Sequence, residues 1–305
     1  MSNKYDVIII GAGPAGLTAA LYLSRNDMNV AFIEGYVPGG KMAEQSKIEN
    51  YPGFSFISGI ELSTKMLEQA RQNGANFIYG MVEKIESIED NLKKVVLADK
   101  SEHFAQVVII ATGMKNLVPT SIEGIEQFKG RGVSYCVLCD GALYKNEPCA
   151  IIGGGNSAFE EAPYLASMAS EVHIFVRDGI IAEKRLVNDV KKYNNIIIHE
   201  NSEILKLFGT EKVEKVEARV GDEIKEFKIS AVFPYIGFKP ATNFIENKEL
   251  LDARGFIKVD ENMETMEKNI FAVGDVIVKD VRQITTATSD GTIAAKVINS
   301  RIIKD

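Results

Sequence analysis

One supersecondary unit occurs twice along the chain, and this repeat restricts the fold more than any other feature. An apolar segment at 7–10 leads into a Gly-rich turn, a helical stretch over 17–25 and an apolar segment at 30–33, and residues 150–176 repeat this order. A strand, a G-x-G-x-x-G/A turn, a helix and a parallel strand make up the dinucleotide-binding βαβ unit. The sequence therefore predicts an α/β fold with two Rossmann-like dinucleotide-binding domains of the three-layer ββα type. The two turns read Gly11-Ala12-Gly13-Pro14-Ala15-Gly16 and Gly153-Gly154-Gly155-Asn156-Ser157-Ala158.

The segments around the repeats predict how the domains divide the chain. A length of 305 residues suffices for two domains with cores of their own. Segments 113–119 and 237–242 each contain Gly and Pro and are candidate linkers. We expect a discontinuous first domain, residues 1–116 and 245–305, with a second domain, residues 117–244, inserted into it. The other expected elements are helices at 59–73 and 285–303, β segments at 77–88, 93–98, 107–110 and 270–273, and a β-meander over 203–217 and 223–236.

Charge and hydropathy exclude several classes of partner. The formal net charge is -7, and no local cluster of Lys and Arg stands out, which argues against binding nucleic acid or an anionic membrane. The polar N-terminus runs straight into the first strand, and no apolar run approaches the roughly 18 residues of a membrane span. We therefore expect a cytoplasmic protein.

The first Gly-rich turn has the features of a complete nucleotide site. Gly11, Gly13 and Gly16 permit a tight turn, close approach of a pyrophosphate and close helix packing. The following helix N-terminus offers free N–H groups to phosphate. Glu34 lies 18 residues after Gly16, close to the spacing at which a carboxylate binds ribose hydroxyls.

The second turn repeats the glycines but lacks the acid. Gly153, Gly155 and Ala158 occupy the three positions of the pattern, and the next apolar segment ends in Val176-Arg177. An acid there favours an unphosphorylated ribose, whereas an arginine can pair with a 2′-phosphate. A single arginine can equally be an ordinary solvated side chain.

Two cysteines three residues apart predict redox chemistry. Cys136 and Cys139 can reach disulfide distance within a turn. A zinc site would need a second such pair or histidine ligands, and His103, His173 and His199 are scattered, so we expect no metal. The neighbouring Asp140-Gly141 argues against two unrelated buried cysteines, whereas Cys149, at the start of an apolar segment, is expected to be a packed small side chain.

The position of the cysteine pair implies a flavin. Cys139 precedes Gly153 by only 14 residues, which places the pair in the second domain. Hydride transfer and thiol–disulfide exchange differ in kind, and a flavin carries out both. If FAD occupies the first site, the nicotinamide and the dithiol must each reach it, so we expect them to alternate by a hinge at the linkers.

Several motifs, spread over nearly the whole chain, occur in the same order as in one known family. Together they resemble the low-molecular-weight thioredoxin reductases. The resemblance implies a homodimeric FAD enzyme that passes electrons from NADPH to thioredoxin. The matching segments are the turn at 11–16, Glu49-Asn50-Tyr51-Pro52-Gly53, Ala111-Thr112-Gly113, residues 134–141 and 153–162, Gly274-Asp275 and Arg282-Gln283.

The resemblance also implies roles for single residues. Cys139 would be the thiol nearest the flavin, Cys136 the one that attacks the thioredoxin disulfide, and Asp140 the acid–base group, although an aspartate there can also cap a helix. Glu34 would bind the adenosine ribose and Asp275 the ribityl chain. Gly39 and Gly40 would line the FAD pyrophosphate, and Gln283 the flavin neighbourhood. The other expected cofactor contacts are Pro14, Ala15, Asn50, Ala111, Thr112, Gly113, Gly274, Arg282, Asn156, Ser157 and Arg177.

The chain departs from the family at the motif for the 2′-phosphate. The family carries His-Arg-Arg, three residues and a further Arg, whereas this chain is one residue short, keeps Arg177 and has Ile181 at the last position. Each lost charged contact costs roughly 1.5–3 kcal/mol of NADPH binding. Three sources of electrons remain open: NADH, NADPH helped by Lys184 or Arg185, or a protein donor such as ferredoxin or flavodoxin. A flavoprotein redox sensor with a vestigial nicotinamide site is the alternative from another class.

Overall fold

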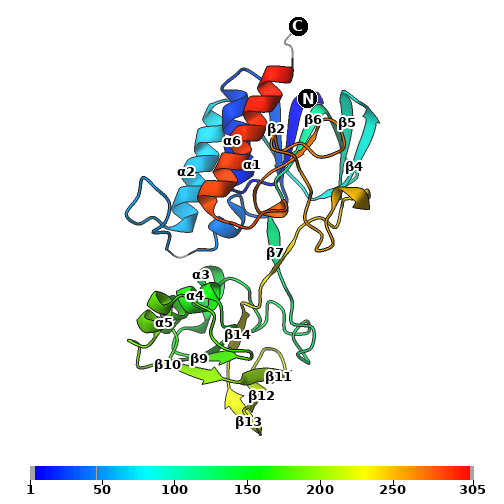
Figure 1. The fold of residues 1–305 in the computed structure, drawn as a ribbon. Coiled ribbons are helices and arrows are strands. Elements are labelled where there is room, and N and C mark those ends of the chain that lie inside the picture. Colours follow the sequence, from blue (N-terminus) through cyan, green and yellow to red (C-terminus); the bar gives the residue numbers. More distant parts are fainter. Residues whose placement is uncertain (1–3, 46, 303–305) are drawn as a thin grey trace. The chain divides into compact units, whose positions relative to one another are not determined.

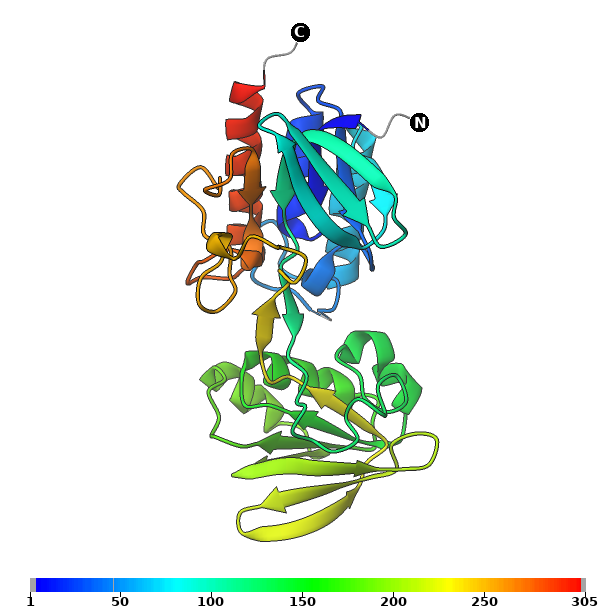
Figure 2. The same cartoon turned by 90° about the vertical axis from the view of Figure 1, so that its right-hand side faces the viewer.

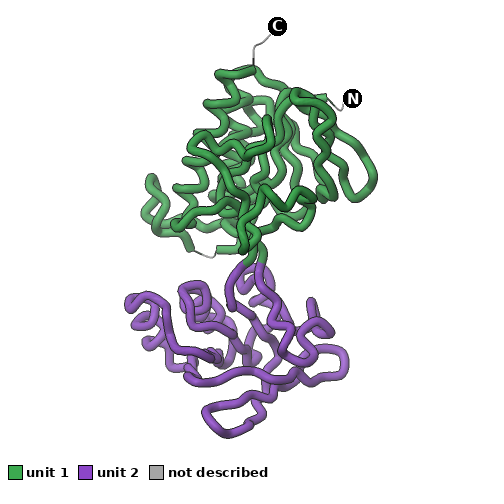
Figure 3. Tube along the Cα trace, turned by 45° about the vertical axis from the view of Figure 1, so that its right-hand side comes forward, with its two compact units in different colours: residues 1–115, 239–305 green, residues 116–238 purple. Residues whose placement is uncertain are grey.

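The structure is a computed structural model that describes residues 4–45 and 47–302. The chain divides into two compact units, Met1–Lys115 with Lys239–Asp305, and Asn116–Phe238 (Figure 3). The second unit is inserted into the first. The two connections between them run along β7 (Met114–Asn116) and β15 (Phe238–Pro240), which pair with each other.

The first unit is built on a sheet in the order β3-β2-β1-β6-β5-β4, with β16 also pairing with β6. The pairs among β1, β2, β3, β6 and β16 are parallel, and β5 pairs antiparallel with both β6 and β4. In the register of the parallel part, Ile10 lies beside both Ile33 and Ile110. The strands are β1 (Lys4–Ile10), β2 (Val30–Glu34), β3 (Asn76–Tyr79), β4 (Val82–Glu89), β5 (Leu92–Leu97), β6 (Glu102–Ile110) and β16 (Ile270–Ala272).

Alternate residues of β1 enter two different cores, which makes this unit three layers deep. Val7 and Ile9 pack with the helices α1 (Pro14–Ser24) and α6 (Ile284–Arg301), which lie with α2 (Gly59–Gln72) on one side of the strands (Figure 1). Ile8 and Ile10 pack with β5 and with the segment around Ile257 on the other side. Because both faces are covered, the buried parts of β1 and β2, residues 7–10 and 30–33, are continuously apolar, as parallel strands are.

The second unit repeats this layering. Its parallel sheet has the order β10-β9-β8-β14, and β11, β12 and β13 form an antiparallel sheet. Figures 1 and 2 show that antiparallel sheet on the side of the parallel strands opposite to the helices. The elements are α3 (Val137–Asp140), β8 (Pro148–Ile152), α4 (Asn156–Ala166), β9 (Glu171–Val176), α5 (Lys184–Val190), β10 (Ile196–Glu200), β11 (Ser202–Phe208), β12 (Lys215–Val220), β13 (Glu223–Lys228) and β14 (Ala231–Pro234). The two units together thus form the predicted α/β fold with two dinucleotide-binding domains.

Some elements differ from the sequence prediction. The end of the predicted meander, β14, is wholly buried and joins the parallel sheet beside β8, because its residues are continuously apolar rather than alternating. Helix α5 and strand β10 had no predicted counterpart. Helix α6 ends at Arg301, and the predicted end at residue 303 lies outside the described residues. No helix in the described ranges is both long and apolar enough to span a bilayer.

Candidate flavin, nucleotide and dithiol sites

In the first Gly-rich turn, two of the three glycines are required by packing. Gly11 has a φ of +107°, and a Cβ placed there would lie 2.4 Å from the carbonyl oxygen of Ala111. A Cβ on Gly16 would lie 2.0 Å from the carbonyl oxygen of Gly11. Gly13, the N-cap of α1, is different, because a Cβ there would meet no atom of residues 4–45 and 47–302 within 4 Å. The turn is therefore closed toward the sheet and open at Gly13, where a phosphate needs room.

Glu34 is held at the edge of this turn. Its Oε2 accepts a hydrogen bond from the backbone N–H of Ala12 at 3.0 Å, and its Oε1 accepts one from the N–H of Tyr36 at 2.9 Å. Each carboxylate oxygen has a further lone pair for a ribose hydroxyl. The geometry therefore fits the expected role.

The segment around Gly39 and Gly40 borders the open side of the turn. Both glycines have positive φ, +112° and +53°, and the N–H of Gly39 donates to the carbonyl of Ala12 at 2.7 Å. A Cβ on Gly40 would lie 3.7 Å from Cα of Gly13. The two segments expected to line a pyrophosphate are thus brought together.

Asp275 carries an unsatisfied acceptor. It follows β16 on the 3₁₀ helix Gly274–Val276, and the N–H of Gly274 donates to Oδ2 of Asp290 at 3.0 Å. Oδ1 of Asp275 is buried and has no hydrogen-bond partner among the described residues, and burial raises the pKa of this carboxyl. A buried acceptor without a donor costs roughly 1–3 kcal/mol. A polyhydroxylated chain such as the ribityl group supplies such a donor, so the residues present fit FAD.

The remaining candidates of this unit lie close to the ones above. Oγ1 of Thr112 donates to the carbonyl of Ala241 at 2.8 Å, at the end of β6. Asn50 donates from Nδ2 to Oε1 of Gln283 at 3.1 Å, which joins two distant segments. The guanidinium of Arg282 lies 4.3 Å from the Phe256 ring centroid.

The second Gly-rich turn has the same architecture. Gly153 has a φ of +143°, and a Cβ there would lie 2.3 Å from the carbonyl oxygen of Tyr235. Gly155, the N-cap of α4, again has nothing within 4 Å, and Ala158 is fully buried. Asn156 exchanges two hydrogen bonds with Glu183, donating from Nδ2 to Oε1 and accepting from its N–H. This turn can therefore hold a second dinucleotide.

The ribose end of this second site differs from the first. The N–H of Gly11 donates to Ile33 and that of Gly153 donates to Phe175, so Val176 occupies the position of Glu34. Val176 is buried and offers no oxygen. Arg177 donates from Nε and Nη2 to Oδ2 of Asp178, at 2.7 and 2.6 Å, and both side chains are more than 70% exposed. Ile181 is 84% exposed. Arg177, the side chain that a 2′-phosphate would need, is thus already paired with the carboxylate of Asp178.

Cys136 and Cys139 form a disulfide, with their Cα atoms 5.3 Å apart. Cys136 is the N-cap of the short helix α3, and its Sγ accepts a hydrogen bond from the N–H of Cys139 at 3.1 Å. The N–H of Val137 donates to the hydroxyl of Tyr235 at 3.3 Å. An N–H directed at Sγ of Cys136 stabilises a thiolate on this sulfur once the disulfide is open.

Asp140 is connected to the cysteine pair through Ser134. Oγ of Ser134 donates to Oδ2 of Asp140 at 2.7 Å and accepts from the N–H of Cys136 at 3.2 Å. Within the described chain, the side chain of Asp140 caps no helix. Ser134 and Tyr235 had not been singled out from the sequence. Ser134 was detectable only as a neighbour of the cysteines, and Tyr235 lies 98 residues from Val137.

Cys149 lies apart from this chemistry. It is fully buried on β8, and burial raises the pKa of its thiol to about 12. A thiol with so high a pKa is a poor nucleophile. It therefore has the packing role expected from the sequence.

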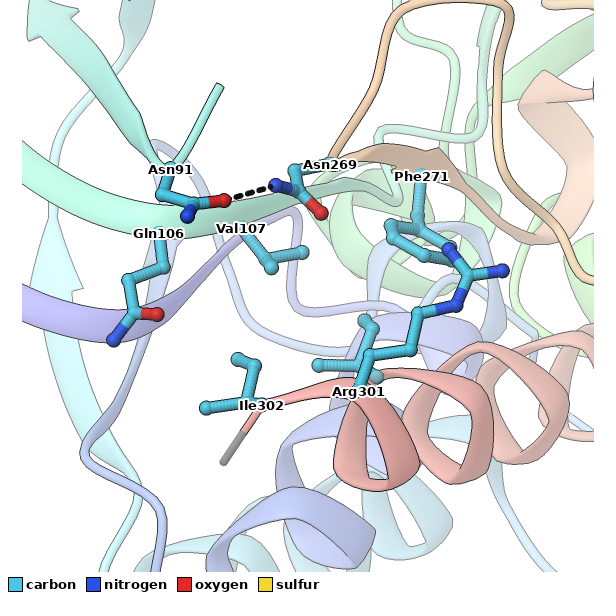
Figure 4. A pocket seen from close by; sticks show the side chains of 8 residues that line it. Asn91, Gln106, Val107, Asn269, Phe271, Arg301 and Ile302 are labelled. Atoms are coloured by element: carbon cyan, nitrogen blue, oxygen red, sulfur yellow. Dashed lines mark hydrogen bonds between the residues drawn. The ribbon is translucent and has the colours of Figure 1, made fainter. Parts of the chain in front are cut away.

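A pocket in the first unit lies away from these sites. It is lined by Asn91, Gln106, Val107 and Asn269 and by the end of α6, where Arg301 extends over the Phe271 ring (Figure 4). Gln106 and Val107 lie on β6 well before its carboxyl end, whereas the Gly-rich turn contacts Ala111 directly beyond that end. The pocket is therefore separate from the cradle at residues 11–16.

Two dinucleotide turns and a disulfide within one chain define an oxidoreductase of the nucleotide–disulfide class. The family model described as pyridine nucleotide-disulphide oxidoreductase matches residues 5–291. A thioredoxin reductase of Mycoplasmopsis pulmonis is 48% identical over 99% of this chain and 99% of its own. The chain therefore belongs to the pyridine nucleotide-disulphide oxidoreductase family, in the branch of the low-molecular-weight thioredoxin reductases.

Solved structures agree with this assignment. The thioredoxin reductase of Lactococcus lactis has a TM-score of 0.90 and 40% identity, and the match covers 97% of this chain and 98% of that one. A ferredoxin-flavin thioredoxin reductase from Clostridium acetobutylicum is 29% identical with a TM-score of 0.53, and the match covers 98% of both chains. The family is an FAD and pyridine-nucleotide family, which agrees with the cofactor pair predicted from the sequence.

Proposed function

We propose that this chain reduces the disulfide of thioredoxin, or of a similar small redox protein, with electrons from a nicotinamide. The observation that carries this proposal is the Cys136–Cys139 disulfide in a unit with its own dinucleotide turn. FAD in the first unit would accept a hydride and pass two electrons to a disulfide. Glu34, Asp275 and the turn at 11–16 would hold it, and the turn at 153–158 would hold the nicotinamide nucleotide.

The two thiols then have separate tasks. In the reduced pair, the Cys136 thiolate attacks one sulfur of the partner disulfide and releases the other as a thiolate. The Cys139 thiolate attacks Sγ of Cys136, which releases the second partner thiol and restores the Cys136–Cys139 disulfide. The hydrogen bond from the N–H of Cys139 to Sγ of Cys136 favours Cys136 as the attacking thiolate.

Asp140 would act as the acid–base group for this exchange. Its carboxylate accepts from Ser134, which also accepts from the N–H of Cys136. We expect Asp140→Asn to lower the rate of thioredoxin reduction by about a hundredfold, because an amide cannot exchange the proton. Stopped-flow measurement with the pre-reduced protein checks this, with Asp178→Asn as a control outside the dithiol. An unchanged rate in Asp140→Asn would leave Asp140 a structural residue.

For the donor, we propose that the second turn binds NADH at least as tightly as NADPH. Asp178 occupies donors on Nε and Nη2 of Arg177 and adds a negative charge beside this arginine. We expect Asp178→Asn to raise NADPH affinity about tenfold, with little change for NADH, since one repulsive carboxylate is removed. Anaerobic flavin bleaching by each nucleotide measures both affinities. A wild-type protein that binds NADPH clearly more tightly than NADH would refute this proposal.

The same anaerobic bleaching experiment is also run with the protein donors ferredoxin and flavodoxin. If neither nucleotide bleaches the flavin but reduced ferredoxin does, the donor is a protein, as the name of the Clostridium acetobutylicum relative states for that enzyme. If no donor leads to thioredoxin thiols, the redox-sensor alternative replaces the proposed function. A protein donor is included in the test because Ile181, which is exposed, stands where the family has the last phosphate-binding arginine.

We further propose a homodimer that works in the cytoplasm. The first unit exposes large apolar side chains, among them Tyr36, Phe56 and Ile60, which a second copy could cover. A pair that must alternate between dithiol and disulfide is suited to a reducing compartment. Sedimentation at micromolar concentration tests the dimer, and a mass of one chain would contradict it. Cell fractionation tests the compartment.

A further inference from the structure

Lys41 lies directly after the two glycines that border the first turn. It belongs to the 3₁₀ helix Gly40–Met42, whose N-cap Gly39 is tied to Ala12 by a 2.7 Å hydrogen bond. Gly40 is packed against Gly13, the open point of the cradle. The backbone thus fixes the start of the Lys41 side chain next to the place where the turn leaves room for phosphate.

The surroundings of Lys41 are unusual for a lysine. Burial lowers its pKa to about 8, while the carboxylates of Glu44 and Asp275 act in the opposite direction. Burial likewise raises the pKa of Glu44, and Lys41 offsets part of that shift. Lys41 is therefore within electrostatic reach of Asp275, 234 positions away in the sequence, whose Oδ1 is the unsatisfied buried acceptor. Its backbone follows Gly39 and Gly40 beside the first turn, and its ammonium group interacts electrostatically with Asp275.

Two other cations near Asp275, Lys279 and Arg282, also make interactions within the protein. Nζ of Lys279 is bonded to Asp290, and Arg282 stacks on Phe256 while its guanidinium reaches the backbone carbonyls of Asp275 and Ile277. The first turn of α1 offers no charged side chain, and Pro14 at its start has no N–H. A pyrophosphate there would meet dipoles and backbone N–H groups, but no full positive charge from this helix.

We propose that Lys41 is a cofactor-binding residue whose ammonium group compensates the pyrophosphate dianion of FAD at the open side of the first turn. This inference rests on FAD binding as proposed above. It assigns a charged contact to a residue outside the Gly-rich pattern. It also explains why a half-buried lysine is kept within electrostatic reach of Glu44 and Asp275.

The test compares FAD binding by the apoprotein of three variants. We expect Lys41→Gln to raise the Kd for FAD about tenfold to a hundredfold, and Lys41→Arg to stay within about threefold of wild type, because the charge is kept. Lys65→Gln, an exposed lysine on α2, is the matched control and should not change the Kd. Quenching of flavin fluorescence measures all four proteins, and their thermal unfolding as apoproteins checks that they are folded.

The pH dependence of FAD affinity is a second readout, and it can be measured on the wild-type protein alone. The dianion raises the pKa of Lys41 above its value of about 8 in the free protein. The contribution of Lys41 is therefore complete below pH 8 and is lost as the pH rises through the higher pKa of the bound state. Wild-type FAD affinity should fall between about pH 8 and pH 10, and Lys41→Gln should not show this fall.

The outcomes separate this inference from the proposed function. Wild-type protein that binds no FAD overturns the proposed function itself. Wild-type protein that binds FAD, with an equal Kd and an equal pH profile in Lys41→Gln, overturns the role of Lys41 alone. If Lys41→Gln does not fold, a wild-type affinity that stays flat from pH 8 to pH 10 overturns it as well.

Discussion

Cys139→Ser should trap thioredoxin on this protein, whereas Cys136→Ser should not. Without Cys139, the Cys136 thiolate can still attack the partner disulfide, but the reductase has no second thiol to complete the exchange. The thiolate released on thioredoxin can only reverse the attack, so a mixed disulfide accumulates. Without Cys136, the attacking sulfur is missing. In both variants we expect steady-state thioredoxin reduction to fall by about a thousandfold or more, since the dithiol acts as a unit.

Cys149→Ala is the matched control for these variants. Cys149 is buried, and its thiol has a pKa raised to about 12, so its removal should leave the rate within about twofold of wild type. Non-reducing gel electrophoresis with oxidised thioredoxin detects the mixed disulfide. A covalent complex with Cys136→Ser and none with Cys139→Ser would reverse the two roles. Full activity in both variants would remove the pair from the mechanism.

Alanine at two glycines of the first turn should have opposite consequences. In Gly16→Ala the new Cβ would lie 2.0 Å from the backbone oxygen of Gly11, and neither strand nor helix can move away easily. We expect a loss of roughly 3 kcal/mol in the free energy of unfolding of the apoprotein. Gly13 has a φ of -77° and nothing within 4 Å, so Gly13→Ala should change this free energy by only about 0.5 kcal/mol.

The two variants should lose FAD affinity for different reasons: Gly13→Ala by a direct clash with FAD, and Gly16→Ala through the damaged fold. In Gly13→Ala the added methyl group occupies the space left for the pyrophosphate, so the Kd for FAD should rise at least about tenfold in a folded protein. In Gly16→Ala any loss of FAD follows from the damaged fold. Urea unfolding of the apoproteins and FAD titration measure the two effects separately. Equal FAD affinity in Gly13→Ala and wild type would show that the pyrophosphate does not bind at this turn.

The features that follow from local spacing could be predicted from the sequence. The glycine positions, Glu34 at the end of β2 and the Cys136–Cys139 disulfide all depend on residues close together in one βαβ unit or turn. The repeat of the unit also gave the α/β class. Strand β14 was assigned to the wrong sheet, because a short buried run does not reveal its neighbours and only the pairing with β8 defines it.

The contacts that tune the sites could not be predicted in the same way. The pairing of Arg177 with Asp178 depends on how the loop after β9 directs two exposed side chains. The link from Asp140 through Ser134 to Cys136 depends on the backbone turn between them. Lys41 comes within electrostatic reach of Asp275 because β1 and β16 both pair with β6. Such long-range neighbours are set by the sheet order, which no local pattern encodes.

The most direct test of the electron path is an anaerobic reductive titration of the FAD-loaded protein with NADH, and in parallel with NADPH. A flavin and a disulfide each accept two electrons, so we predict that about two equivalents of nicotinamide per chain are consumed before the flavin is fully bleached. In Cys136→Ser about one equivalent should suffice. Bleaching of the wild-type flavin by a single equivalent, with the Cys136–Cys139 disulfide still closed, would contradict the proposed path from nicotinamide to the dithiol.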